Sequence, residues 1–172
     1  FGGSLIRPEA TGYGLVYFVE EMLHRRHMSF EGMHVAVSGA GNVAQFAIEK
    51  AMSLGAKVVT VSDSGGTAYD PEGFTGEKLA TLIEVRGRGD GRVADYARRV
   101  GVAYEAGKRP WHLPVDIALP CATQNELDGD DAKRLVANGV ACIAEGANMP
   151  CTPEAVEVFE HADVLYAPGK AS

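Results

Sequence analysis

Two glycines separated by one residue carry the clearest chemical signal in this sequence. The string Gly39-Ala40-Gly41-Asn42-Val43-Ala44 follows a short apolar run and opens a segment with helical spacing of apolar residues. In such a GxGxxA turn, the first glycine permits the tight bend and the second lets backbone amides approach a phosphate group. A pyrophosphate would lie at the N-terminus of the helix, where unpaired amides and the helix dipole favour an anion. The motif and its context therefore predict a dinucleotide site.

A single carboxylate, Asp63, stands between two serines in the stretch VVTVSDSGGT, residues 58–67. An acid at the end of the second strand of a dinucleotide-binding fold usually binds the ribose hydroxyls of NAD. A carboxylate about 5 Å from each unit of 2′-phosphate charge would repel it by roughly 3 kcal/mol at an effective dielectric near 20. That repulsion cancels one arginine hydrogen-bonded to the phosphate, which contributes about 1.5–3 kcal/mol. Binding of NADP therefore requires several cations near Asp63, or an aspartate that is turned elsewhere.

Three arginines in the segment RGRGDGR are the candidate cations for such a phosphate. They are Arg86, Arg88 and Arg92, and they follow the helix that comes after the second expected strand. The alternative is a solvated basic loop, because arginines are usually exposed. The positions of these side chains relative to Asp63 decide between the two cofactors.

The elements that must position these residues alternate between helix and strand. A first helix is expected at residues 11–26 with Thr11 as its N-cap, and Asp70-Pro71-Glu72-Gly73 is a turn signature that predicts a small hairpin. The expected strands are residues 34–38, 57–62, 115–120, 141–144 and 164–167. One further helix is expected from the glycine turn to Gly55, three more over residues 77–85, 93–100 and 130–137, and a last one that begins at Pro153. The strands are short and apolar throughout. The chain is therefore predicted to be α/β, with a Rossmann-like, doubly wound, mostly parallel sheet covered by helices on both faces.

Composition narrows the class of protein. The 172 residues fit one domain, and the net charge of −7 argues against a general nucleic-acid or anionic-membrane surface. Three cysteines without a CxxC pair suit a reducing compartment, so the cytoplasm is the expected location. The scattered histidines predict no metal site, and no GK[ST] string suggests phosphoryl transfer. No charged and apolar leader or membrane-length apolar run is present in the sequence.

Longer strings carry a resemblance that is more specific than the glycine motif. SLIRPEATGYGLVYF, VSGAGNVAQ, VSDSGGT, DGRVADYA, LPCATQNELD and AEGANMP closely resemble the coenzyme-binding domain of hexameric bacterial glutamate dehydrogenases, most of all the NADP-dependent branch. The resemblance runs from about Ser4 to Ala171. It implies one dinucleotide-binding domain over residues 1–172, taken from a longer chain whose N-terminal substrate domain and C-terminal helices are absent. The missing start methionine agrees with a fragment of this kind.

The resemblance also implies roles for individual residues. Arg7 matches a residue near the cofactor phosphates, and Thr11 matches one that contacts the nicotinamide carboxamide. The resemblance assigns Ser38, Gly39, Gly41, Asn42 and Val43 to the pyrophosphate turn. It assigns Asp63 and Ser64 to the adenosine end of the cofactor, with Arg86 and Arg92 as cations. The residues that it assigns to the nicotinamide end are Ala122, Thr123, Gln124, Gly146, Ala147 and Asn148. Cys121 is expected to be a buried packing residue, and Glu145 a structural one. No catalytic residue is assigned to this chain, because the acid–base groups of the family belong to the missing domain.

The implied function is hydride transfer in the conversion of L-glutamate, water and NADP to 2-oxoglutarate, ammonia and NADPH. The serines and glycines around Asp63 favour NADP, with Asp63 turned from the 2′-phosphate and Ser64 facing it, and NAD remains the alternative cofactor. The substrate would bind through the missing domain, and the parent protein would be a homohexamer. The alternatives are the coenzyme domain of a branched-chain or aromatic amino-acid dehydrogenase, and a non-catalytic nucleotide-sensing module of the same fold.

Overall fold

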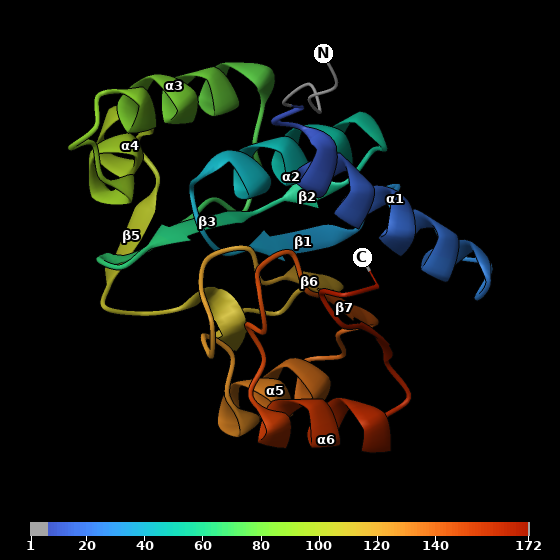
Figure 1. The fold of residues 1–172 in the computed structure, drawn as a ribbon. Coiled ribbons are helices and arrows are strands. Elements are labelled where there is room, and N and C mark those ends of the chain that lie inside the picture. Colours follow the sequence, from blue (N-terminus) through green and yellow to red (C-terminus); the bar gives the residue numbers. More distant parts are fainter. Residues whose placement is uncertain (1–6, 172) are drawn as a thin grey trace, which may run out of the picture.

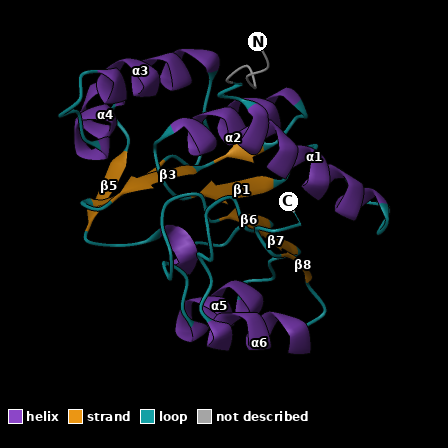
Figure 2. Cartoon of the chain, viewed as in Figure 1, coloured by secondary structure: helices purple, strands orange, loops and turns teal. Residues whose placement is uncertain are grey.

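The computed structural model describes residues 7–171, in which helices alternate with strands of a central sheet (Figures 1 and 2). In chain order, the elements are α1 (Ala10–His24), β1 (His34–Val37), α2 (Asn42–Ser53), β2 (Lys57–Val58), β3 (Thr60–Asp63), β4 (Gly66–Tyr69), α3 (Gly76–Gly87), α4 (Val93–Val100), β5 (Ala103–Ala106), the 3-10 turn η1 (Pro110–His112), β6 (Ile117–Leu119), α5 (Gly129–Ala137), β7 (Cys142–Ala144), α6 (Pro153–His161) and β8 (Leu165–Ala167).

Five strands form a parallel sheet in the order β2-β1-β6-β7-β8. From β1 the chain moves outward to β2, then crosses to β6 on the other side and continues to β8. Helices α1 and α2 cover one face, and α5 and α6 cover the other (Figure 1). The prediction of a doubly wound, mostly parallel sheet is therefore confirmed. The reversal of direction between β1 and β6 is the place where ligands bind in sheets of this type.

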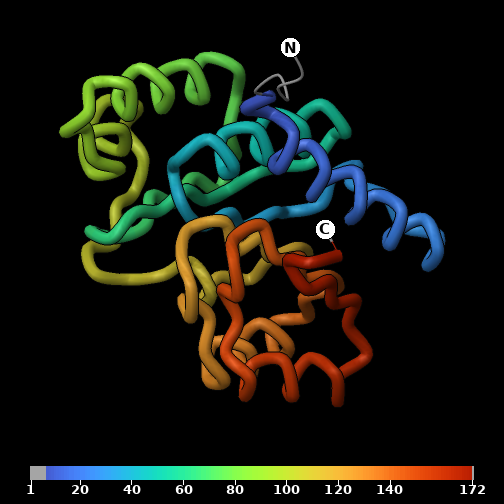
Figure 3. The backbone as a smooth tube through the Cα atoms, in the orientation of Figure 1, coloured from blue at the N-terminus to red at the C-terminus, as the bar shows by residue number. Residues whose placement is uncertain are grey.

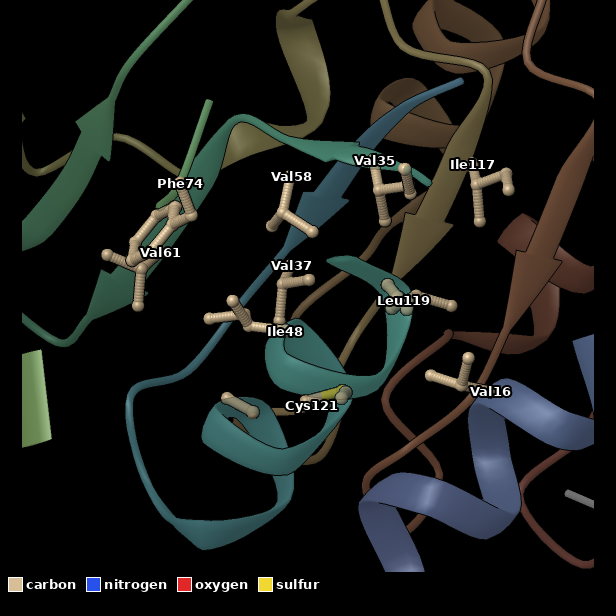
Figure 4. Packing of buried hydrophobic residues seen from close by; sticks show 14 of the residues in the cluster. Val16, Val35, Val37, Ile48, Val58, Val61, Phe74, Ile117, Leu119 and Cys121 are labelled. Carbon is tan, nitrogen blue, oxygen red and sulfur yellow. The ribbon is translucent and has the colours of Figure 1, made fainter. Parts of the chain in front are cut away.

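Apolar residues on both faces of the strands explain why the sheet is buried between two helical layers. Val35 and Val37 of β1 pack beneath α2 with Ile48 of that helix (Figure 4). Ala36 points to the opposite face, where it joins the cluster that contains Phe159 of α6. Because successive side chains of a strand alternate between faces, a continuous apolar run fits this sandwich and would not suit a sheet with one solvated face.

The second expected strand divides into two parts at Val59. Its first part, β2, pairs with β1, whereas β3 leaves the parallel sheet and forms an antiparallel meander with β4 and β5. Where the backbones separate, the Thr60 hydroxyl donates to the Val37 carbonyl at 3.0 Å and accepts from the Val37 amide at 2.9 Å. The Thr60 hydroxyl thus serves as the partner of both the amide and the carbonyl of Val37, which the separation of the two strands would otherwise leave unpaired.

Two local predictions were wrong. The hairpin between β3 and β4 turns at Ser64 and Gly65 rather than at Asp70-Pro71-Glu72-Gly73, which instead makes the turn that leads into α3. The N-cap of α1 is Glu9, two residues before the expected Thr11, because the helix begins at Ala10. Thr152, by contrast, is the N-cap of α6 as its type indicates, and its hydroxyl accepts from Ala155 N.

Candidate functional site

The loops that follow β1, β6 and β7 meet at the carboxyl edge of the sheet. The amides of Gly146 and Ala147, which follow β7, donate to the Pro120 carbonyl after β6 at 2.9 and 3.1 Å. The backbone tube shows the loops after β6 and β7 running side by side near the start of α2 (Figure 3). The sheet therefore brings together the predicted pyrophosphate turn and both loops predicted for the nicotinamide end.

The glycine turn has the geometry that its motif predicts. Gly39 has φ +83°, and a Cβ atom there would lie 2.8 Å from the Cys121 carbonyl oxygen. Gly41, the N-cap of α2, has φ −87°, and a Cβ atom on it would meet nothing within 4 Å. No side chain caps α2, so the amides of its first turn, at Asn42 and Val43, face an open space. An anion placed there meets unpaired donors and the positive end of the helix dipole.

A buried carboxyl group, Glu126, joins the glycine turn to the loop after β6. Its Oε1 accepts from the Ser38 hydroxyl at 2.8 Å, from Ala122 N at 2.9 Å and from Thr123 N at 3.3 Å. The Ser38 oxygen in turn accepts from Cys121 N at 2.9 Å. Desolvation raises the pKa of Glu126, and the hydrogen bonds that it accepts reduce this shift. Nothing in the string CATQNELD marks one acid as buried, so the sequence alone does not reveal Glu126.

The raised pKa of Glu126 makes stability depend on pH. A carboxyl group that holds its proton more tightly in the folded than in the unfolded state stabilises the fold below the ordinary glutamate pKa, and this stabilisation is lost as pH rises through the folded value. Glu126→Gln keeps an oxygen acceptor for Ser38 and does not ionise. We therefore expect urea unfolding midpoints of the Glu126→Gln variant to change less between pH 4 and pH 8 than those of the unsubstituted protein. An equal dependence on pH in both would contradict this assignment.

Asp63 is turned into the protein. Its side chain is 8% exposed; Oδ1 accepts from Gly65 N at 2.8 Å, and Oδ2 accepts from Val93 N at 2.9 Å and lies 3.9 Å from Arg86 Nη1. The carboxylate thus closes the β3–β4 turn and satisfies an amide at the start of α4. Ser64, in contrast, is exposed, and its hydroxyl oxygen accepts from Arg92 Nη1 at 3.3 Å.

The three candidate arginines occupy different surroundings. Arg86 is partly buried, and its Nη1 donates to the Gly91 carbonyl at 2.6 Å. Arg88 pairs with Glu84 on the exposed side of α3. Arg92 is exposed beside Ser64. The structure therefore places one arginine at the end of β3 with its charge open to a ligand, and a second behind it as the partner of Asp63.

A cleft of about 590 Å³ opens beside Ser64. It is lined by Ser62, Asp63, Ser64, Gly66, Gly107, Lys108, Arg109, Ala122, Thr123 and Glu126. Lys108 and Arg109 are not among the residues predicted from the sequence, although two cations directly after a glycine are a visible signal there. The Thr67 hydroxyl donates to the Lys108 carbonyl at 2.7 Å, and Arg109 Nη1 donates to the Glu126 carbonyl at 2.6 Å. The backbone of Lys108 and the side chain of Arg109 are thus held in place at the wall of this cleft.

A second cleft, of about 550 Å³, adjoins the loops after β6 and β7. Gln124 and Asn148, both predicted at the nicotinamide end, line it together with Met149. Glu145 fixes this region: its Oε1 accepts from the Tyr166 hydroxyl at 2.8 Å and its Oε2 from Gly169 N at 2.8 Å. These bonds agree with the structural role expected for Glu145.

The residues predicted near α1 lie close to the glycine turn. A Cβ atom on Gly12 would be 2.7 Å from the Val43 carbonyl oxygen, so the first turn of α1, which holds Thr11, packs directly on the start of α2. Thr11 is exposed there, and Arg7 precedes the helix and is also exposed. Within residues 7–171, neither side chain is joined to the glycine turn by a hydrogen bond or an ion pair.

Cys121 is buried, and burial raises the pKa of its thiol, with the nearby Glu126 as a second cause. A protonated, buried thiol is a poor nucleophile, in agreement with the packing role expected for Cys121. Among residues 7–171, no group of three or more His, Cys, Asp or Glu side chains could hold a metal ion. No helix in the described part of the chain is long and apolar enough to cross a membrane.

Comparisons with known proteins identify the family. The family model for Glutamate/Leucine/Phenylalanine/Valine dehydrogenase matches residues 2–172. All 172 residues align with the NADP-specific glutamate dehydrogenase of Escherichia coli K12 at 69% identity and with the NAD(P)-specific enzyme of Xylanibacter ruminicola at 58%. The chain spans 38% and 39% of the length of these two proteins. The crystal structure of Plasmodium falciparum glutamate dehydrogenase superposes with a TM-score of 0.94 at 45% identity, over 99% of this chain and 37% of that one. The chain belongs to the Glutamate/Leucine/Phenylalanine/Valine dehydrogenase family.

Proposed function

We propose that residues 1–172 form the coenzyme-binding domain of an NADP-preferring glutamate dehydrogenase. The 69% identity to an NADP-specific glutamate dehydrogenase over the whole chain supports the activity, and the 38% share of that relative's length supports a single domain of a longer polypeptide. In the parent protein, L-glutamate, water and NADP would be converted to 2-oxoglutarate, ammonia and NADPH. The substrate would bind outside these residues, and assembly as a homohexamer stays a prediction of the family resemblance.

In this proposal the chain binds and orients the cofactor without supplying acid or base. The nicotinamide of the bound cofactor would accept the hydride from the substrate carbon. The amides at the start of α2 would bind the pyrophosphate, and Gly41 lets it approach because no side chain occupies the space in front of the helix. The loops after β6 and β7 would hold the nicotinamide half.

The orientation of Asp63 is the observation that carries the preference for NADP. Its carboxylate is occupied by two backbone amides and Arg86, and it is 8% exposed, so it is not presented to a ribose 2′ position. Ser64 and Arg92 are exposed at the same turn, and they offer a hydroxyl and a guanidinium instead. A charged hydrogen bond of this kind contributes about 1.5–3 kcal/mol, which is roughly tenfold to a hundredfold in affinity.

Titration of the chain with NADP and NAD tests the cofactor preference. We expect NADP to bind about tenfold to a hundredfold more tightly than NAD, with a difference that shrinks as salt is added, because Arg92 is exposed. Equal affinities, or tighter binding of NAD, would contradict the preference.

Assays of the full-length protein with glutamate, leucine, phenylalanine and tryptophan test the substrate class. The proposal requires glutamate-dependent reduction of NADP. Faster reduction with leucine or an aromatic amino acid would favour another branch of the family, and cofactor binding without any reduction would favour a nucleotide-sensing module.

A further inference from the structure

Met149 combines two features that are unusual for a methionine. Its backbone is left-handed, with φ +47°, a region that side-chain-bearing residues rarely adopt, and it precedes Pro150, which restricts its backbone further. The residue is also 52% exposed, among the most exposed large apolar residues of the described part of the chain. A methionine that is both strained and exposed gains nothing from burial in the free protein, so its conformation needs another explanation.

Backbone hydrogen bonds between the loops after β6 and β7 hold Met149 in place. Asn125 N donates to the Met149 carbonyl at 3.0 Å, and Leu127 N donates to the Pro150 carbonyl at 3.0 Å. Asn125 is itself left-handed, with φ +54°. A parallel bridge between Leu127 and Cys151 continues the pairing. The strained backbone is therefore fixed by its surroundings before any ligand arrives, as is common for residues that position a ligand.

The loop that carries Met149 begins beside the glycine turn. A Cβ atom on Gly146 would lie 2.5 Å from Cys121 Sγ and 3.5 Å from Val43 Cγ1, so the loop packs directly on the first turn of α2. From there it leads to Met149, which lines the 550 Å³ cleft with Gln124 and Asn148. With the pyrophosphate at α2 and the adenosine half on the β3 side, the other half of a dinucleotide must extend over this loop.

We propose that Met149 is held in its left-handed conformation so that its side chain packs against the nicotinamide ring of the bound dinucleotide. The inference rests on the proposed cofactor function and adds a residue that selects the position of the ring. A thioether is flexible and polarisable, and it makes favourable contacts with aromatic rings. The exposed part of Met149 would become buried when the cofactor binds.

Two substitutions in the full-length protein test this role. Glycine tolerates the left-handed backbone, so Met149→Gly should leave the unfolding midpoint unchanged or raise it while removing the side chain. We expect its dissociation constant for NADP to rise about twofold to tenfold, the range given by the loss of a sulfur–aromatic contact. Affinity for adenosine 2′,5′-bisphosphate, which lacks the nicotinamide half, should stay unchanged. Met149→Leu supplies an apolar side chain of similar volume without the sulfur, so it should recover only the part of the NADP affinity that comes from apolar packing.

Other results would overturn the role of Met149. Equal weakening of NADP and the bisphosphate, or a lowered unfolding midpoint without rescue by leucine, would make Met149 a structural residue. Slower turnover at unchanged NADP affinity would mean that the side chain contacts something other than the cofactor. The failure of the unsubstituted protein to bind NADP would instead contradict the proposed function itself.

Discussion

Gly39→Ala is expected to destabilise the fold by about 2–5 kcal/mol, whereas Gly41→Ala, two residues later, leaves the fold nearly intact and weakens cofactor binding. At Gly39 the backbone has φ +83°, and the new methyl group would lie 2.8 Å from the Cys121 carbonyl oxygen. Left-handed strain costs about 1–2 kcal/mol and overpacking about 1–3 kcal/mol, and the two add because neither relieves the other. The neighbour is backbone, which cannot move aside as a flexible side chain would.

Gly41 is the matched control, because alanine fits its backbone. With φ −87° and no atom within 4 Å of a built Cβ, alanine should cost only about 0.5–1 kcal/mol at this N-cap position. The methyl group would, however, occupy the space in front of the α2 amides. We therefore expect the dissociation constant for NADP to rise about tenfold or more, from an overpacking cost of about 1–3 kcal/mol in the complex.

Urea unfolding and cofactor titration of both variants separate the two effects. An unfolding midpoint of Gly39→Ala equal to that of the unsubstituted chain would show that the turn can rearrange, against the geometry described above. Unchanged NADP affinity in Gly41→Ala would show that the pyrophosphate does not approach this glycine, and would count against the dinucleotide site at α2.

The glycine turn could be predicted from sequence because its requirements are local. Positive φ at Gly39 and a free approach at Gly41 depend on a few consecutive residues, and a strand before and a helix after them complete the pattern. The parallel sheet was predictable for the same reason, since short apolar strands between helical segments have few other arrangements. The N-cap of α1 could not be predicted, because a shift of one or two residues in a helix start, here from Thr11 to Glu9 at the cap, changes which side chain stands there.

Other features depend on contacts between distant parts of the chain. The direction of Asp63 is decided by the Val93 amide, 30 residues away, and by Arg86 near the end of α3. The buried position of Glu126 depends on Ser38, 88 residues earlier. No propensity or spacing within one segment reports such a contact. The type of Asp63 alone favours NAD, and the orientation of its side chain removes that argument.

Charge reversal of Arg92 is expected to lower NADP affinity by about a hundredfold and to leave NAD affinity nearly unchanged. Arg92→Glu removes a charged hydrogen bond worth about 1.5–3 kcal/mol and adds repulsion between two anions, which exposure and salt reduce. The backbone amide of Arg92 still donates to Asp95 Oδ2 at 3.0 Å, so the start of α4 keeps this bond. Titration with both cofactors at low and high salt measures the effect.

Charge reversal of Arg86 should have a different effect from that of Arg92, although both arginines belong to the same basic segment. Arg86 donates to the Gly91 carbonyl and lies 3.9 Å from Asp63 Oδ2, so Arg86→Glu would place two carboxylates together and leave a carbonyl without its partner. We expect a loss of about 1–3 kcal/mol in the free energy of unfolding, with weaker binding of both cofactors. Arg88→Glu is the matched control, because Arg88 pairs with Glu84 on the exposed side of α3 and should affect neither cofactor.

These three variants distinguish a 2′-phosphate site from a merely basic loop. If the segment acted only through its overall charge, all three reversals would weaken NADP to a similar degree, because each changes the net charge by the same amount. The positions of the side chains require instead a selective loss at Arg92, a loss of stability at Arg86 and no effect at Arg88. Equal effects at Arg88 and Arg92 would contradict the assignment of the phosphate to the turn at Ser64, even if the chain prefers NADP.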